Sequence, residues 1–156
     1  MERRARPAPL SAPLRLSVQV AVSTPVPART TLRRWALAAI QRPCQVTLRV
    51  VGAVEGRRLN AAFRGRDYAT NVLTFAYGEQ DGWLCGDIAL CAPVIAREAR
   101  GQGKAPRAHW AHLVAHGLLH LQGWDHARAR EARAMEALET EILRRLGYPD
   151  PYLMAA

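Results

Sequence analysis

The apolar positions near the start of the chain follow the period of β-strands. Residues 14–22 alternate between Leu or Val and other residues, as the two faces of a half-buried strand require. Pro25 and Pro27 end this stretch, and the same alternation returns at residues 46–50, just before Gly52. The pattern therefore predicts two strands early in the chain.

Helices are predicted from apolar residues three and four apart, from residues that can cap or begin a helix, and from glycines that end one. These helices are expected from Thr30 or Thr31 to about Gln41 and at about 54–63, 93–100, 108–122 and 127–146. We expect Thr30 or Thr31 to cap the first helix and Asp125 to cap the last. Two further strands are predicted in the second half of residues 67–77 and at 83–91, around a polar loop with Gly78, Asp81 and Gly82.

Strands mixed with helices favour the α/β class, with helices packed on a small sheet. At 156 residues the chain is long enough for one domain with a proper core, and it contains no internal repeat. Residues 1–13 are rich in Arg and Pro, which predicts a flexible basic tail. The single domain is therefore expected to span residues 14–156.

The charge balance favours a polyanionic partner. Lys and Arg number 22 against 13 acidic residues, which gives a formal charge of +9 and an isoelectric point near 10.7. Nucleic acid is the commonest partner of such a protein. The alternative is a compositional bias toward Arg, because Lys104 is the only lysine.

The three cysteines, Cys44, Cys85 and Cys91, are odd in number and lack the C-x-x-C spacing. They therefore indicate neither a disulfide framework nor a cysteine metal site. The prolines of the first 13 residues break up any secretory signal, and no run is long enough to cross a bilayer. We expect a soluble cytoplasmic protein without a membrane partner.

All five histidines lie between His109 and His126. In a helix, His116 and His120 lie one turn apart on one face, so both imidazoles can reach one metal ion. Gly123 permits a sharp exit from that helix, which could bring His126 back to the same point. Three imidazoles with an open fourth position are typical of a catalytic zinc site.

A histidine beside an apolar helical stripe is more often a core or boundary residue than a ligand, and His109 and His112 keep that interpretation. The position after His116 also limits the chemistry. Zinc proteases with the motif H-E-x-x-H carry their general base there, whereas this chain has Gly117. A protease would need its base from elsewhere, and the glycine either leaves the ion approachable or allows close helix packing.

A second group of residues precedes the third strand. Arg64 stands beside a glycine, and its planar guanidinium can donate two hydrogen bonds to a phosphate. From the residue types alone, Arg64 is more readily interpreted as an ordinary surface arginine than as a phosphate-binding residue. Asp67 could hold an arginine or cap a turn, and we expect the turn.

Three motifs together resemble the YbeY family of bacterial rRNA maturation factors. They are residues 59–75 (LNAAFRGRDYATNVLTF), 86–88 (GDI) and 116–126 (HGLLHLQGWDH), and the resemblance runs from Leu14 to Tyr152. It implies an α/β fold around a small mixed sheet. It also implies a metal-dependent endoribonuclease that prefers single strands and acts in 16S rRNA 3′-end maturation and ribosome quality control.

The resemblance makes His116, His120 and His126 the ligands of one Zn²⁺ ion per chain and Arg64 the catalytic residue that contacts phosphate. Many family members have Asp where this chain has Asn71. The implied partners are single-stranded RNA, rRNA precursors and the small ribosomal subunit, with no DNA expected. Residues 1–13 have no clear counterpart in the family.

The resulting hypothesis is hydrolysis of an RNA phosphodiester by a zinc-bound water, with Arg64 neutralising charge on the phosphoryl oxygens. Asp125 or a backbone carbonyl is a candidate for orienting a ligand imidazole, and no general base is visible. Attack by the RNA 2′-hydroxyl remains an alternative. So do two other functions: a ribosome assembly factor whose metal is structural, and a zinc hydrolase that acts on amides.

Overall fold

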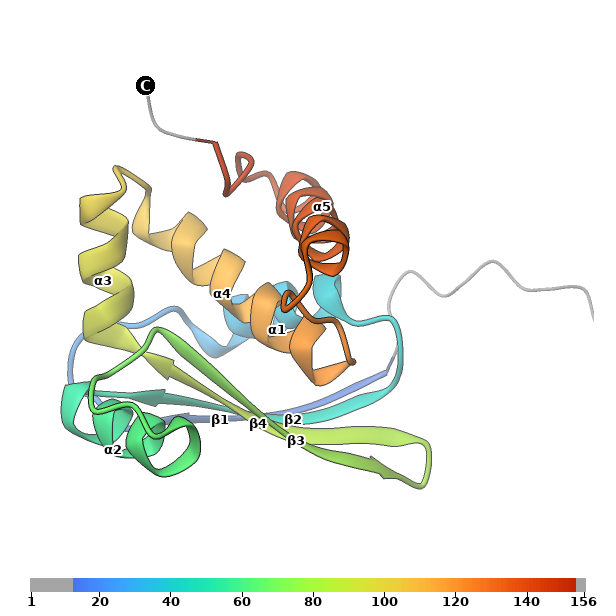
Figure 1. Cartoon of the computed structure of the whole chain (residues 1–156), viewed down its shortest axis with the longest axis horizontal. Coiled ribbons are helices and arrows are strands. Elements are labelled where there is room, and N and C mark those ends of the chain that lie inside the picture. Colours follow the sequence, from blue (N-terminus) through green and yellow to red (C-terminus); the bar gives the residue numbers. More distant parts are fainter. Residues whose placement is uncertain (1–12, 154–156) are drawn as a thin grey trace, which may run out of the picture.

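A computed structural model describes residues 13–153, which form a four-stranded sheet and five helices (Figure 1). The predicted tail lies outside the described residues except for Pro13. Among residues 13–153, no helix is both long and apolar enough to span a membrane.

The sheet is mixed, and its strand order is β1-β2-β4-β3. Strands β1, β2 and β4 run parallel to one another, whereas β3 pairs antiparallel with β4 and forms one edge. A parallel connection needs a crossover and an antiparallel pair needs only a short turn, which here is Asp81–Gly82. The strands are β1 (Leu14–Val20), β2 (Cys44–Val51), β3 (Val72–Gln80) and β4 (Trp83–Cys91).

Helices cover the two faces of the sheet unequally. In Figure 1, α1, α4 and α5 lie on one face and α2 lies on the other. The predicted α/β class with a small mixed sheet in one domain is thereby confirmed. The helices are α1 (Arg29–Ala39), α2 (Ala53–Arg64), α3 (Ala92–Gly101), α4 (Pro106–Leu121) and α5 (Ala129–Arg145).

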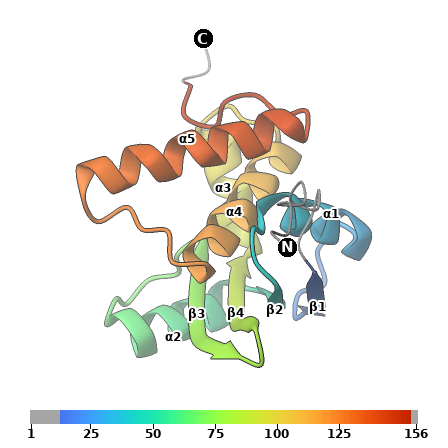
Figure 2. The same ribbon diagram turned by 90° about the vertical axis from the view of Figure 1, so that its right-hand side faces the viewer.

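Helix α4 is the centre of the packing. It lies between the sheet and α5 (Figure 2) and also contacts α1 and α3. Because neighbours surround it, α4 is apolar on most of its circumference rather than along one stripe. Its fully buried residues include Ala111, Val114 and Leu118, and they share one core with Leu48 and Ile88 of the sheet. All the histidines except His126 are therefore carried by the central helix of the fold.

The predicted helix caps are wrong. Helix α1 starts after Ala28 and α5 starts after Arg128, and neither has a side-chain cap. Asp125 lies too early in the chain to cap α5, and its Oδ1 instead accepts a hydrogen bond from the backbone N–H of His126 at 2.7 Å. Gly78 is likewise not a loop residue, because it lies in β3 at a shift in the strand register.

Candidate metal centre

Three imidazole rings converge at the end of α4. The ring centroids of His116 and His120 lie 4.5 Å apart, and the centroid of His126 lies 5.5 Å from the first and 4.9 Å from the second. Each residue offers one nitrogen, and the three nitrogens lie within 4.8 Å of one another. The structure thus brings together all three residues that the sequence singled out as ligands.

The loop after α4 carries His126 back to the helix. Gly123 has φ +98°, a conformation that side chains with a Cβ rarely adopt, and it reverses the chain there. The turn is closed by two backbone hydrogen bonds, from Gly123 N to His120 O and from Trp124 N to Leu119 O, both 3.0 Å long. Asp125 then fixes the backbone of His126 through the hydrogen bond described above. The ring of His126 is therefore placed by its loop rather than by a helix.

The electrostatics of the group favour a neutral ring at His120. Burial, together with the nearby imidazoles of His116 and His126, lowers the pKa of His120 to about 4. A neutral imidazole keeps a nitrogen lone pair available for a cation. Within the described part of the chain, no fourth His, Cys, Asp or Glu belongs to this group. The donor set therefore fits a metal ion with at least one open coordination position.

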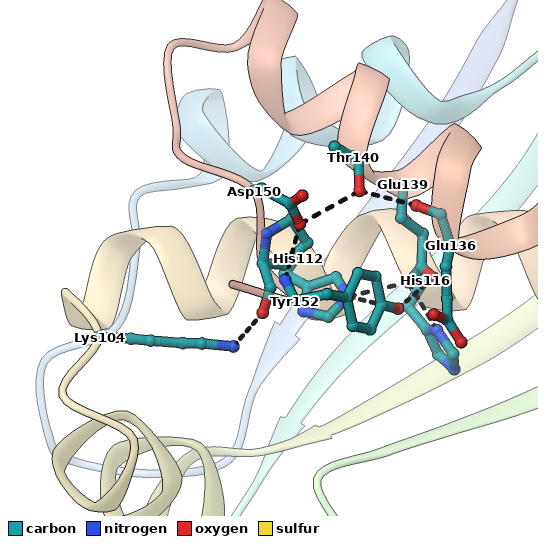
Figure 3. A network of polar contacts seen from close by, with 9 residues as sticks. Lys104, His112, His116, Glu136, Glu139, Thr140, Asp150 and Tyr152 are labelled. Atoms are coloured by element: carbon teal, nitrogen blue, oxygen red, sulfur yellow. Dashed lines mark hydrogen bonds and ion pairs between the residues drawn. The ribbon is translucent and has the colours of Figure 1, made fainter. Parts of the chain in front are cut away.

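Glu139 of α5 is a member of this site that the sequence analysis missed. It is 1% exposed, and its Oε2 accepts a hydrogen bond from His116 Nδ1 at 2.8 Å (Figure 3). Glu139 lies four residues after Met135 and three before Ile142, on the apolar stripe. A carboxylate among the apolar positions of this helix was the feature of the sequence that could have revealed its buried role.

The imidazoles of His109 and His112 contact carboxylates and do not join the three-histidine group. His109 Nε2 lies 2.9 Å from Glu98 Oε1, and His112 Nε2 lies 2.9 Å from Glu139 Oε2. Both residues are buried, as expected for histidines at the boundary of a core.

Arg64 and the three histidines line the same hollow in the protein surface. This hollow, of about 480 Å³, is lined by Arg64, by residues of β3 and by the side chains of His116, His120 and His126. Arg64 is exposed at the end of α2, and no acidic side chain of residues 13–153 forms a salt bridge with it. Its guanidinium is therefore available to an anion.

Several contacts hold the end of α2 against β3 and against the segment that connects them. The ring of Phe63 packs on Phe75 of β3 with centroids 4.3 Å apart, and the buried Asn60 donates from Nδ2 to Tyr68 O at 2.7 Å. The carboxylate of Asp67 accepts hydrogen bonds from Nε and Nη2 of Arg57, at 2.7 and 2.8 Å. The expectation that Asp67 caps a turn was therefore wrong, because a nearby arginine on α2 takes up both of its oxygens.

Asn71 lies where the segment after α2 enters β3. Its Nδ2 donates to Glu98 Oε1 at 3.0 Å, and its Oδ1 accepts from Val72 N at 2.6 Å. An ionised aspartate could accept the second bond but could not donate the first. The pair with Glu98 therefore depends on the amide that this chain carries.

The geometry favours the packing interpretation of Gly117. A Cβ atom at this position would meet Ile88 Cγ2 at 2.9 Å, closer than real Cβ contacts. The Gly117 carbonyl also accepts a hydrogen bond from Thr74 Oγ1 at 3.3 Å. The absence of a side chain lets α4 lie directly on β3 and β4.

Comparison with known proteins places these features in a family. The sequence profile described as "Endoribonuclease YbeY" matches residues 27–147. Two curated proteins of that name are similar over most of their length. The protein from Aromatoleum aromaticum is 55% identical over 91% of this chain and 94% of its own. The protein from Nitrosomonas europaea is 56% identical over 89% of this chain and 85% of its own.

A solved structure supports the fold. The solution structure of a Thermotoga maritima protein matches with a TM-score of 0.52 and covers 90% of this chain and 99% of its own. The two sequences are 23% identical, so this likeness concerns the fold alone. Together, the matching profile and the relatives above 50% identity show that the chain belongs to the endoribonuclease YbeY family.

Proposed function

We propose that this protein is a metal-dependent endoribonuclease that cleaves single-stranded RNA by hydrolysing a phosphodiester. One observation carries the proposal. The guanidinium of Arg64 and the imidazoles of His116, His120 and His126 line the same hollow, although Arg64 lies more than 50 positions earlier in the chain. A cation site and an anion-binding group side by side suit a phosphodiester.

His116, His120 and His126 would hold the metal, and zinc is the proposed ion because three neutral imidazoles and an open position are its usual catalytic set. When bound there, the ion would supply a water whose pKa is lowered from about 15.7 toward 7, and so a nucleophile at neutral pH. The three neutral imidazoles would add no negative charge to the site, which favours an anionic substrate.

Arg64 would bind the scissile phosphate. Its planar fork can donate two hydrogen bonds to non-bridging oxygens and offset the charge that develops there in the transition state. Gly65, with φ +66°, ends α2 directly after Arg64. The arginine therefore projects from the end of a helix that Phe63 fastens to β3.

Phe63 supports the preference for single strands. Its side chain is 64% exposed and lines the hollow beside Arg64, although it also packs on Phe75. An exposed aromatic face can stack with a base, and a base held in a duplex is already stacked and paired. A flexible single strand can present both its phosphate to Arg64 and its base to Phe63.

The finer assignment follows from family membership and charge. We infer that the substrates are rRNA precursors of the small ribosomal subunit in the cytoplasm, with 16S rRNA 3′-end maturation as the reaction. A formal charge of +9 suits binding to ribosomal RNA.

The proposal is tested by incubating the zinc-loaded protein with end-labelled RNA, as a single strand and as the matching duplex, and mapping the ends. We expect cleavage of the single strand and its loss with a chelator. A single 2′-deoxy nucleotide at the scissile position should leave hydrolysis intact, whereas attack by the 2′-hydroxyl would stop. No RNA cleavage, with retained binding to small-subunit precursors or with cleavage of amides, would overturn the proposal.

A further inference from the structure

Glu139 is one of the few ionisable side chains that the fold buries completely, and it lies behind the metal centre. We propose that Glu139 is a positioning residue that fixes the ring orientation and tautomer of His116. The inference rests on the proposed function only in taking His116 as a metal ligand.

The contacts define which atom of His116 faces the centre. Glu139 Oε2 lies 2.8 Å from His116 Nδ1. An ionised carboxylate can only accept hydrogen bonds, so Nδ1 must carry the proton. The neutral ring then has its lone pair on Nε2, the nitrogen on the other side of the imidazole. Glu139 thereby makes Nε2 the ligand atom.

Glu139 is held in its ionised form by three donors. His112 Nε2 donates to Oε2 at 2.9 Å, and the Tyr152 hydroxyl donates to Oε1 (Figure 3). With N–H and O–H groups directed at both of its oxygens, Glu139 is surrounded as an acceptor, and His116 Nδ1 is one of these donors.

The C-terminal segment completes this arrangement. Tyr152 N donates to Asp150 Oδ1 at 2.8 Å. Thr140 Oγ1 of α5, which donates to Glu136 O at 2.8 Å, lies 3.4 Å from the same Asp150 oxygen. Lys104, just before α4, donates from Nζ to the carbonyl of Pro151 (Figure 3). The segment thus contacts α5 and the residues before α4, and its tyrosine donates to Oε1 of Glu139, the oxygen that His116 does not contact.

The same residues could be interpreted as a second metal site, since His112, His116 and Glu139 also group three ligand atoms. The distances argue against this. Ligand atoms about 2.0 to 2.1 Å from one tetrahedral zinc lie about 3.3 Å from each other. The two nitrogen–oxygen distances here, 2.8 and 2.9 Å, are those of direct hydrogen bonds. An oxygen shared by two N–H donors leaves no room for an ion between them.

Partners of this kind matter for metal affinity. A ligating histidine usually donates its other N–H to a carboxylate or carbonyl, which fixes the tautomer and raises the basicity of the ring. Loss of such a partner typically weakens metal binding about 10- to 100-fold. Nothing else among residues 13–153 hydrogen-bonds to the His116 ring.

The experiment compares Glu139→Gln and Glu139→Leu with Glu141→Gln, a carboxylate on the same helix that is exposed and paired with Arg144. Zinc affinity is measured by competition with a chelator. The tautomer of His116 in the metal-free protein is read from its ¹⁵N chemical shifts. Glu139→Gln keeps an acceptor but loses the charge, so we expect zinc binding to weaken about tenfold with Nδ1–H retained.

Glu139→Leu should weaken zinc binding about 100-fold and shift His116 toward the Nε2–H tautomer. Glu141→Gln should change neither. If the leucine variant does not fold, the glutamine variant decides by itself, and unchanged zinc affinity in it overturns the proposal. Two zinc ions per wild-type chain, with one lost in Glu139→Gln, would also overturn it. Neither readout uses RNA, so failure of the nuclease proposal would leave this test unaffected.

Discussion

A substitution of Arg64 can separate RNA cleavage from metal binding. Arg64 shares the hollow with the three histidines but contacts none of their ligand atoms through a hydrogen bond in the described chain. Arg64→Ala should therefore keep its metal and lose RNA cleavage by about 100-fold or more, the usual loss when a group that stabilises transition-state charge is removed. Metal content and the single-turnover rate measure the two effects.

The matched control for this variant is Arg58→Ala, on the same helix, exposed and outside the hollow. It removes the same charge from the protein but should cleave RNA normally. Equal losses of activity in both variants would mean that Arg64 contributes only to general attraction of RNA. Loss of metal in Arg64→Ala would assign it a structural role.

Phe63 should contribute to RNA binding rather than to metal binding. Stacking of one base on an aromatic ring contributes about 1 to 3 kcal/mol, so Phe63→Leu should weaken binding of a single strand by about tenfold. Leucine keeps an apolar contact with Phe75, and Phe63→Tyr should restore affinity because it restores the ring. Fluorescence anisotropy with a labelled oligonucleotide measures both. Equal affinity of the leucine and tyrosine variants would exclude stacking.

The thiols should be inert in the folded protein. Cys44, Cys85 and Cys91 are all buried and unpaired, and burial raises the pKa of Cys44 to about 11 and also raises that of Cys91. Because the thiolate is the reactive species, we expect slow labelling by a thiol reagent at pH 8 and rapid labelling of all three after denaturation. Rapid labelling of the native protein would contradict the packing of β2 and β4.

Local spacing made part of the site predictable. His116 and His120 are paired by the helix period alone, and Gly123 indicated the turn that returns His126. Glu139 could not be paired with His116 in this way, because the contact depends on how α5 crosses α4. Arg64 could be connected to the histidines only through the resemblance, since no local rule relates the end of α2 to the end of α4.

Every helix and strand was predicted, from periodicity together with β-forming residues and the positions of Pro and Gly, and the boundaries were off by a few residues. The caps failed because the predicted Thr and Asp residues lie a few positions from the real starts at Arg29 and Ala129. Strand order was not predictable, since alternation says which side chains share a face but not which strand is the neighbour. The antiparallel edge strand β3, which forms a wall of the hollow, follows from that order.

The close approach of β4 to its neighbours gives a stability prediction. A Cβ on Gly86 would meet the backbone oxygen of Phe75 at 2.5 Å and would also collide with Leu121 Cδ1. Because a backbone oxygen within a sheet cannot give way, Gly86→Ala should lower the free energy of unfolding by about 3 kcal/mol, the upper end for overpacking. Urea denaturation monitored by circular dichroism measures the change.

The control for this variant is Gly101→Ala at the end of α3, where an added Cβ meets nothing within 4 Å. Alanine is the better helix former, so this change should be neutral or stabilise by up to about 1 kcal/mol. Similar losses in the two variants would show that the approach of β3 to β4 is looser than the structure has it.

The hollow lies where α2, β3 and α4 meet. An ion bound there contacts the native state alone and should therefore stabilise the whole molecule. A ligand at 100 times its dissociation constant adds about 2.7 kcal/mol to the stability of the native state. For a chain of this size that corresponds to a rise in Tm of about 5 to 10 °C. We expect this rise when zinc is added to the wild type and not to His120→Ala. Calorimetry measures it, and equal responses would place the ion elsewhere.

In the function proposed above, three imidazoles hold one metal ion and leave part of its coordination sphere to solvent and substrate. The most direct test is a crystal structure of the zinc-loaded protein with an anomalous difference map recorded at the zinc edge. We predict one peak, about 2.0 to 2.1 Å from nitrogens of His116, His120 and His126, with no other protein ligand. A peak between His112 and Glu139, or a fourth protein group closing the sphere, would contradict the account.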